Sequence, residues 1–514
     1  ENRGRTSQSA LKRHSCRRGI RPLDDPRHGG LLLRCPYRPG AVPQVIGTGR
    51  RRGKPRNVAD VKGHWLLGVV PEMVQALRDK RLHGKLSDWH EQFGDTIYIH
   101  IPFQPASVST IDPAVVEHIL KKNFENYPKG KLFRDRMTDL LGNGIFNVDG
   151  ESWHTQRKTS SKMFTANKFK NHIWRVVEKN SAKVVQVLQS VGDGTEDIFN
   201  LMNRFTLDSI GEIGFGSDIG SLEHADSPFL KSFDTAQQVV LFRFLIPGWQ
   251  FMRLFGIGTE SGVAKHFKLL QDYSMKLVQI LKSKLDSAAG DSFVGLFIKG
   301  AKEDGQPADD AFMRDLVLNF LIAGRDTTAQ GMSWCFFEVM QHPEVERQIV
   351  EEIQSVCGAE KLTYEQAGKL EYLQAVISES LRLHPSVPVD MKQVLTDDVL
   401  PNGTFVPKGS SVWYTAYGMA RSKKIWGEDA AVFRPARWLE MKQPPDPYSY
   451  PVFHAGPREC LGKRLAQVEM KALLASVLRD FHLRLAVPVE TIKADTQLTI
   501  GMYPGLPCFV EARC

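Results

Sequence analysis

A helical period that runs without interruption from Asp309 to Gln341 constrains the fold more than any other feature of this sequence. Asp309 suits the N-cap of a helix, and His342-Pro343, directly after Gln341, ends it. About 33 residues at 1.5 Å each give a helix of roughly 50 Å, which is long enough to cross a whole domain. Its centre, residues 323–328, contains Gly and Thr, which weaken a helix, so we expect a local distortion there.

The rest of the chain shows mostly helical periods and a few short alternating segments. A second helix is predicted from about residue 363 to 384, before Pro385, and a last one from about residue 461 to 480. Short strands around turns with Pro and Gly are predicted at residues 399–406, 411–417, 499–503 and 508–511. The fold class is therefore mainly α with a minor β part.

The basic residues are concentrated at the N-terminal end. Residues 1–52 contain 13 Lys and Arg against 3 Asp and Glu, whereas the whole chain has 67 and 58, so the remainder is electrically balanced. We expect residues 1–55 to be a basic tail, either disordered or artefactual, and residues 56–514 to form one domain. The alternative for the tail is an arm for an anionic partner. No stretch approaches the roughly 18 apolar residues of a membrane span, so no transmembrane anchor is expected in this chain.

Residues 453–462, FHAGPRECLG, carry the most specific chemistry in the sequence. An isolated cysteine is usually a small buried hydrophobic residue. Cys460, however, lies at the expected N-terminus of the last helix, where N–H groups favour a thiolate. Gly456 and Gly462 allow the backbone to approach a large flat group, and Arg458 offers a cation beside it. The combination suits a metal-bound thiolate in a tight loop.

This segment resembles the signature F-x-x-G-x-R-x-C-x-G of the cytochrome P450 family, the haem-thiolate monooxygenases. Five fixed residues give on the order of 10⁻⁴ chance matches in a chain of this length. The resemblance implies a single-domain P450 fold with haem b (iron protoporphyrin IX) between the long central helix and the Cys loop with the C-terminal helix. It also implies Cys460 as the iron ligand, contacts to haem from Phe453, Gly456 and Gly462, and O2 as co-substrate.

Residues 379–382, Glu-Ser-Leu-Arg, form an E-x-x-R motif on the second predicted helix. Taken alone, Glu379 and Arg382 would be an ordinary surface ion pair three residues apart. The P450 resemblance implies instead that Arg437, in the segment 433–438, completes a structural Glu–Arg–Arg cluster that positions the thiolate loop.

Two further motifs fit the same family. Residues 323–328, Ala-Gly-Arg-Asp-Thr-Thr, match A-G-x-D-T-T, which implies that Gly324 makes room for dioxygen and that Asp326 and Thr327 relay protons. Arg325 occupies the variable position and receives no role. Residues 153–157 match W-x-x-x-R, which implies that the following side chains contact the haem propionates: Trp153 and Arg157, with Arg458 and Lys392.

Four segments resemble the plant, fungal and oomycete fatty-acid ω-hydroxylase branch: 139–150, 318–328, 385–392 and 397–407. The resemblance implies insertion of one oxygen atom of O2 into a C–H bond of a fatty acid, at or near the ω end. Apolar residues expected to line the substrate channel are Phe133, Met137, Leu140, Ile145, Phe146, Phe320, Val387 and Met502, although each could simply belong to the core. Carboxylate contacts are suggested for Arg134, Arg136 and Arg243. Residues 244–249 form either a membrane-facing lip or, more simply, buried packing.

The chain has no flavin or nicotinamide fingerprint, so the resemblance implies electrons from a separate NADPH–cytochrome P450 reductase. A docking face of Lys158, Lys162, Lys463 and Arg464 is one interpretation, and ordinary solvated charge is the other. Relatives of this kind imply the cytosolic face of the endoplasmic reticulum membrane.

Other functions remain open. They are oxidation of another lipophilic substrate (a sterol, alkane or secondary metabolite), isomerisation of a lipid peroxide, and silent haem or nucleic-acid binding. Asp326 and Thr327 argue against the peroxide chemistry, which needs no oxygen activation, and the balanced charge argues against nucleic acid.

Overall fold

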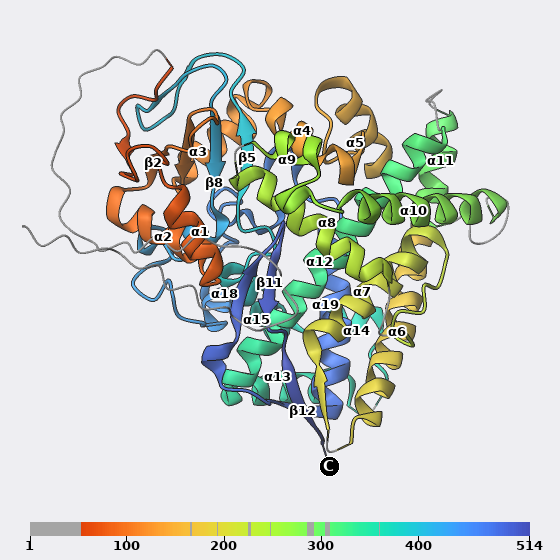
Figure 1. Cartoon of the computed structure of the whole chain (residues 1–514). Coiled ribbons are helices and arrows are strands. Elements are labelled where there is room, and N and C mark those ends of the chain that lie inside the picture. Colours follow the sequence, from red (N-terminus) through yellow and green to blue (C-terminus); the bar gives the residue numbers. More distant parts are fainter. Residues whose placement is uncertain are drawn as a thin grey trace, which may run out of the picture. The chain divides into compact units, whose positions relative to one another are not determined.

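Helices dominate the computed structural model, and strands form a smaller part of it (Figure 1), which confirms the mainly α prediction. The structure describes residues 53–164, 167–192, 194–224, 228–246, 248–284, 292–303, 309–358 and 360–513. The predicted tail falls almost wholly outside these residues, so its boundary at residue 55 stays a prediction. None of the helices in the described part is long and apolar enough to cross a membrane.

The helices are α1 (Val70–Arg78), α2 (Leu82–Phe93), α3 (Pro113–Glu117), α4 (Gly130–Leu141), α5 (Gly150–Phe164), α6 (Asn167–Ser190), α7 (Ile198–Phe215), α8 (Pro228–Leu245), α9 (Trp249–Phe255), α10 (Ala264–Lys284), α11 (Phe293–Glu303), α12 (Asp310–Gln341), α13 (Pro343–Cys357), α14 (Tyr364–Gly368), α15 (Glu371–Leu383), α16 (Ala416–Ala420), α17 (Lys423–Trp426), α18 (Ala436–Glu440) and α19 (Lys463–Asp480). The strands are β1 (Ala59–Asp60), β2 (Thr96–Ile99), β3 (Ser107–Thr110), β4 (Thr195–Asp197), β5 (Asp390–Gln393), β6 (Asp398–Val399), β7 (Phe405–Val406), β8 (Ser411–Tyr414), β9 (Phe481–Leu485), β10 (Lys493–Thr496), β11 (Ile500–Tyr503) and β12 (Pro507–Ala512).

The central helix α12 is confirmed, and Asp309 caps it by accepting a hydrogen bond from the Phe312 backbone N–H at 2.7 Å. It packs against α7, α10, α15 and α19, and it lies deep among the helices in Figure 1. The expected distortion at residues 323–328 is wrong, because α12 is continuous through them. The Thr327 hydroxyl donates to the Ala323 carbonyl one turn earlier at 2.6 Å, and the helix accommodates this side-chain bond without interruption.

The single helix predicted over residues 363–384 is two helices, α14 and α15, because the chain bends at Lys369 and Leu370. The start of α15 is held by Glu352 of α13, whose carboxylate accepts hydrogen bonds from the backbone N–H groups of Tyr372 and Leu373 at 2.7 and 2.9 Å. A cap supplied by another helix leaves no local signal in the sequence.

The main sheet has the strand order β1-β2-β3-β8-β5, and β12 pairs with both β4 and β9. The segment 399–406 forms two two-residue strands, β6 and β7, and the predicted strand over 411–417 ends at Tyr414. Ala416 and Tyr417 instead belong to α16. The strands β11 and β12 confirm the last two predictions to within one residue at each end.

Candidate functional site

The loop before α19 is shaped by close backbone contacts. The Cys460 backbone N–H donates to the Phe453 carbonyl at 2.8 Å. Gly456 has a φ of +68°, and a Cβ there would lie 2.2 Å from the Leu120 carbonyl oxygen, so only glycine fits. Gly462 is the N-cap of α19, which begins at Lys463, two residues later than predicted. Cys460 therefore lies in a turn just before the helix, not within it.

The Cys460 side chain is exposed, whereas Cys335, Cys357 and Cys508 are buried. Dense protein behind the thiol raises its pKa, and the Gly462 backbone N–H and the charge of Arg157 act in the opposite direction. The thiol of this exposed residue therefore has a hydrogen-bond donor and a cation beside it, which are the surroundings that a thiolate needs.

Trp153 and Arg157 lie one turn apart on α5, as the motif predicts. Trp153 is buried, and the Arg458 guanidinium lies over its ring at 4.3 Å from the centroid. Arg458 also donates to Asp149 at 2.8 Å and to the Val148 carbonyl at 3.0 Å. This stacking joins α5 to the Cys460 loop, and the sequence does not show it.

Arg157 is half-buried and forms no hydrogen bond or ion pair with another of the described residues. Burial lowers the pKa of its guanidinium, although the nearby Cys460 and Glu459 partly oppose that shift. The side chain thus keeps its hydrogen-bond donors available close to Cys460, a situation that suits an anionic group.

Lys392 on β5 has a different environment. Its ammonium is buried and forms an ion pair with Asp390 at 2.9 Å, and Asp390 also accepts from Lys129 at 2.6 Å. Burial lowers the pKa of Lys392 to about 7, with Asp390 opposing the shift. The predicted contact of Lys392 with a propionate stays untested, and its partner in the structure is Asp390.

The middle of α12 has one stripe that is not fully buried. Ala323, Gly324 and Thr327 are half-buried, whereas the residues between and after them are buried. A Cβ on Gly324 would lie 2.6 Å from the side chain of Ile210 on α7. This glycine is therefore needed for the close approach of α7, a reason separate from the predicted room for dioxygen.

Asp326 faces away from that stripe and is buried against α8. Arg325, which the sequence analysis left without a role, donates from one nitrogen to Asp326 at 2.9 Å and to Asp234 of α8 at 2.8 Å. Burial raises the pKa of Asp326 to about 6, against the lowering effect of Arg325. The acid of the predicted relay is thus held by an arginine next to it in the sequence.

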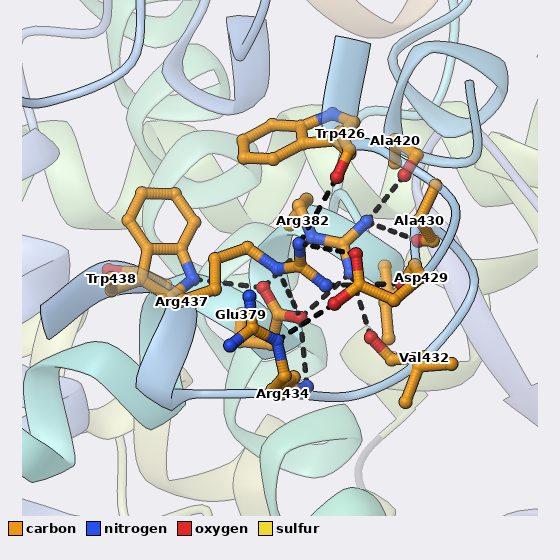
Figure 2. A network of polar contacts seen from close by, with 12 residues as sticks. Glu379, Arg382, Ala420, Trp426, Asp429, Ala430, Val432, Arg434, Arg437 and Trp438 are labelled. Carbon is orange, nitrogen blue, oxygen red and sulfur yellow. Dashed lines mark hydrogen bonds and ion pairs between the residues drawn. The ribbon is translucent and has the colours of Figure 1, made fainter. Parts of the chain in front are cut away.

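Glu379 and Arg382 do not form a surface ion pair, because both side chains are completely buried. Arg382 donates to the two oxygens of Glu379 at 2.9 and 2.8 Å, and Arg437 donates at 3.1 Å, so the predicted cluster is brought together (Figure 2). Burial would raise the pKa of Glu379, but hydrogen bonds and charge from Arg382 and its neighbours lower it below its ordinary value.

The remaining donors of Arg382 bind three backbone carbonyls, those of Ala420, Ala430 and Val432. All five N–H groups of this guanidinium are therefore used. The sequence analysis missed two further donors to Glu379, the Trp438 indole N–H and the Arg434 backbone N–H, both at 2.9 Å. Their position beside Arg437 in the segment 433–438 was the available signal. The cluster ties α15 to the irregular chain before the Cys460 loop.

The expected channel residues come from three secondary-structure elements and two connecting segments. Phe133, Met137 and Leu140 lie on α4, Phe320 on α12, and Met502 on β11, while Ile145, Phe146 and Val387 lie in connecting segments. Phe146 is 39% exposed, Phe133, Phe320 and Val387 are half-buried, and the others are buried. Because α4 contacts α12, at least these two groups share one region.

The turn after α4 is fixed to α12 by side chains that the sequence analysis did not select. Asp315 accepts from the Asn143 backbone N–H at 2.8 Å, and Asn319 accepts from that of Phe146 at 3.2 Å. Asn319 also donates to the Leu141 carbonyl at 2.8 Å. The glycines of this turn, at positions 142 and 144, allow the close approach, because a Cβ on either would overlap one of these side chains.

Two of the three arginines suggested for a carboxylate are already engaged inside the protein. Arg243 is fully buried and paired with Glu260 at 2.7 Å and Asp139 at 2.8 Å, so its charge is neutralised. Arg136 donates to the backbone carbonyl of Arg243 at 2.8 Å. Arg134 is exposed, with Asp149 3.4 Å away. The suggestion of Arg243 is therefore corrected.

The segment 244–249 is packed inward, since Leu245 and Trp249 are buried; Pro247 lies outside the described residues. Of the suggested docking residues, Lys158, Lys463 and Arg464 are exposed. Lys463 also forms an ion pair with Glu459 at 3.2 Å. The side chain of Lys162 lies outside the described residues.

Comparison with known proteins identifies the family to which this architecture belongs. The sequence model of the family described as Cytochrome P450 matches residues 60–509. The chain belongs to the cytochrome P450 family. Cytochrome P450 704C1 of Pinus taeda is 36% identical, covering 85% of this chain and 90% of its own length. Cytochrome P450 704B1 of Arabidopsis thaliana is 35% identical over 89% and 96% of the two chains. Cytochrome P450 94C1 of the same plant is 37% identical over 83% and 90%.

Members of the P450 family are monooxygenases that use a haem iron and dioxygen, and the residues of this P450 fit such a group. Its exposed Cys460 thiol has an N–H donor beside it, and Arg157 has donors without a protein acceptor in the described part of the chain. Gly456 lets the loop approach the Leu120 backbone closely, and α12 offers a half-buried stripe of small residues. The site thus contains side chains that could supply a thiolate ligand and a cation for a propionate, beside a face of small residues on α12.

Proposed function

We propose that this P450 hydroxylates fatty acids at or near the ω carbon, and that the Cys460 thiolate would bind the iron of its haem. The observation that carries the haem assignment is the exposed Cys460, beside the Gly462 N–H and an Arg157 that has no hydrogen-bond partner among the described residues. Bound haem would supply an iron that activates dioxygen, and a thiolate ligand would increase the electron density on it.

Three cationic side chains surround the proposed position of the propionates. Arg157 has the freest donors, Arg458 is fixed by Trp153 and Asp149, and Lys392 shares its charge with Asp390. We assign the first propionate contact to Arg157, since it alone of the three has no other acceptor among the described residues. Phe453, Gly456 and Gly462 would form the loop around the sulfur.

Asp326 and Thr327 are the proposed proton carriers for oxygen activation. Asp326 has a pKa of about 6, so it holds and releases a proton near neutral pH. Thr327 lies on the half-buried stripe of α12, and Asp326 lies on the buried side against α8. The pair thus connects the protein interior to the surface of α12 on which dioxygen would react.

The fatty-acid assignment is supported by the four segments that resemble the ω-hydroxylase branch and by the apolar residues of α4 and α12. A long apolar chain would lie between Met137, Leu140 and Phe320, where burial of each methylene is worth about 0.8 kcal/mol. The presence of Asp326 and Thr327 favours oxygen activation over isomerisation of a lipid peroxide.

Electrons would come from NADPH through a cytochrome P450 reductase, which would bind next to Cys460 through Lys158, Lys162, Lys463 and Arg464. We place the enzyme at the cytosolic face of the endoplasmic reticulum membrane, where an apolar substrate and the reductase are both available. Neutralising Lys158 and Arg464 together should then slow reduction by the reductase at low salt but not reduction by dithionite.

The test combines a spectrum with a product assay. The reduced, carbon-monoxide-treated protein should show a thiolate-type Soret band that Cys460→Ser abolishes and that Cys357→Ser, a change at a buried cysteine, retains. With reductase and NADPH, a chain-length series of fatty acids should give ω-hydroxy acids. Product from a sterol or an alkane but from no fatty acid would contradict the substrate assignment alone, and product from a lipid hydroperoxide without NADPH would contradict the monooxygenation.

A further inference from the structure

The turn between α1 and α2 forms one wall of a surface cavity of about 380 Å³. Residues from three distant parts of the chain line this cavity: residues 79–84, Tyr417 of α16, and Lys493 and Ala494 of β10. They include none of the residues assigned to haem, to proton transfer or to the substrate channel. The cavity is therefore a feature of the fold that the proposed reaction does not use.

The first turn of α2 lines this cavity without a cap. Arg81 occupies the N-cap position, and no side chain caps the helix there. The backbone N–H groups of Leu82, His83 and Gly84 have no hydrogen-bond acceptor among the described residues. In a helix these groups point back along the axis, and together with the helix dipole they favour an anion.

The side chain of His83 belongs to the same wall and also lacks partners. It is 6% exposed, and neither of its ring nitrogens has a hydrogen-bond partner in the part of the chain that the structure describes. The centroid of its ring lies 5.8 Å from that of Tyr417, so two aromatic rings meet at this wall. Because proteins rarely leave buried polar atoms unpaired, the unpartnered ring indicates a ligand at the cavity.

The charged side chains that line the cavity are mostly basic. Lys80, Arg81 and Lys493 carry positive charge there, against the single carboxylate of Asp79. Lys80 and Arg81 have carboxylate partners at 2.5 and 2.8 Å. Lys493 is exposed and forms no ion pair with another described residue, so its charge is available to an anion.

A phosphate group matches the donors of this cavity better than a carboxylate does. Burial lowers the pKa of His83 to about 4, so its ring is neutral near pH 7 and offers one N–H donor. With the three backbone N–H groups of α2, the cavity offers four donors in all. A carboxylate has two oxygens for them, whereas the phosphate of an ester has three terminal oxygens.

We propose that this cavity binds a phosphate monoester, with its oxygens on the first N–H groups of α2 and on His83, and with Lys493 beside them. The volume of the cavity leaves room for the organic part of the ester, which would lie against Tyr417. A soluble metabolite and the headgroup of a lipid such as phosphatidic acid both offer this chemistry.

Calorimetric titration of the holoenzyme with inorganic phosphate and with glycerol 3-phosphate tests the site. It measures binding without turnover, so its outcome is independent of the proposed function. We expect saturable binding of both compounds. Lys493→Glu should weaken the affinity by roughly tenfold, because it places a carboxylate beside the anion. His83→Leu should weaken it by roughly fivefold, because it removes one donor.

Lys361→Glu is the matched control, since it makes the same charge reversal at an exposed lysine between α13 and α14 and should leave the affinity unchanged. A retained Soret band shows that each variant is folded around its haem. Absence of saturable phosphate binding by the wild-type protein would overturn the proposal, and so would an unchanged affinity in Lys493→Glu or in His83→Leu.

Vesicles of phosphatidylcholine with phosphatidic acid distinguish the two sources of the phosphate. Weaker vesicle binding by Lys493→Glu than by Lys361→Glu supports a lipid headgroup as the ligand. Equal vesicle binding by these two variants, together with the expected loss of glycerol 3-phosphate affinity in Lys493→Glu, supports a soluble ester.

Discussion

Arg382 donates to both carboxylate oxygens of Glu379, three residues before it, inside a pocket that excludes solvent from both side chains. The same guanidinium also binds three backbone carbonyls of the chain that follows β8. The ion pair therefore connects α15 to the irregular segment after β8, so its loss should destabilise both parts of the fold.

Arg382→Met should destabilise the protein by about 3–5 kcal/mol, because it leaves the Glu379 carboxylate buried with less charge around it. Arg347→Met is a matched control, since Arg347 forms an exposed ion pair with Glu351 at 3.8 Å and should matter by less than about 0.5 kcal/mol. Urea unfolding of the two holoenzymes measures both changes. Similar losses of unfolding free energy in the two variants would contradict this role of Arg382.

Gly324→Ala tests the close approach of α7 to α12. Alanine favours a helix over glycine by about 1 kcal/mol, but the new Cβ would meet Ile210, and overpacking costs about 1–3 kcal/mol. We expect a net loss of stability in the wild-type background. Ile210→Ala removes Cγ1 and Cδ1, the two atoms that the new Cβ would meet most closely, and should recover part of that loss. Thermal unfolding of the four proteins in a double-mutant cycle should therefore show coupling between the sites.

Acid should weaken the fold through His83, whose two ring nitrogens are buried without partners among the described residues. Burial lowers its pKa from 6.5 to about 4, so between these values the unfolded chain binds the proton and the folded protein does not. The free energy of unfolding therefore decreases as the pH falls. His83 alone should account for a loss of about 2 kcal/mol between about pH 7.5 and about pH 5. His83→Leu should remove that part of the slope in urea unfolding, and an unchanged slope would exclude His83 as its source.

Thr327→Ala should increase the NADPH consumed per product, because the hydroxyl on the half-buried face of α12 would be lost. Thr327→Ser keeps the hydroxyl and should retain most of the coupling, that is, the product formed per NADPH consumed. The comparison separates a chemical role of the hydroxyl from a packing role of the side chain. The measurement is product against NADPH with saturating fatty acid. Equal coupling in the two variants would remove Thr327 from proton delivery.

Features that depend on short sequence spacing were predictable, and those that depend on partners from elsewhere were not. The helix period and the Asp309 cap locate α12, and the E-x-x-R spacing indicates that Glu379 and Arg382 meet. The break between α14 and α15 could not be predicted, because the cap at the start of α15 comes from Glu352 on another helix.

The same limit applies to charge. Lys392 was selected as a cation for a propionate, but a lysine in a sequence does not reveal that Asp390 and burial will share or reduce its charge. Arg325 was left without a role because its partner Asp234 lies on α8, far away in the sequence. In both cases the pairing is a product of tertiary packing, which residue type alone does not encode.

The clamp of Asp315 and Asn319 on the turn after α4 has a consequence for redesign of substrate preference. Because these two side chains bind the backbone of residues 141–146, Ile145 and Phe146 follow any displacement of the first half of α12. Hydrogen bonds thus join two parts of the proposed substrate channel, α12 and the turn after α4. Changing the length of the channel will therefore require substitutions that remove the hydrogen bonds of Asp315 and Asn319. Exchanging a single lining residue leaves those bonds in place.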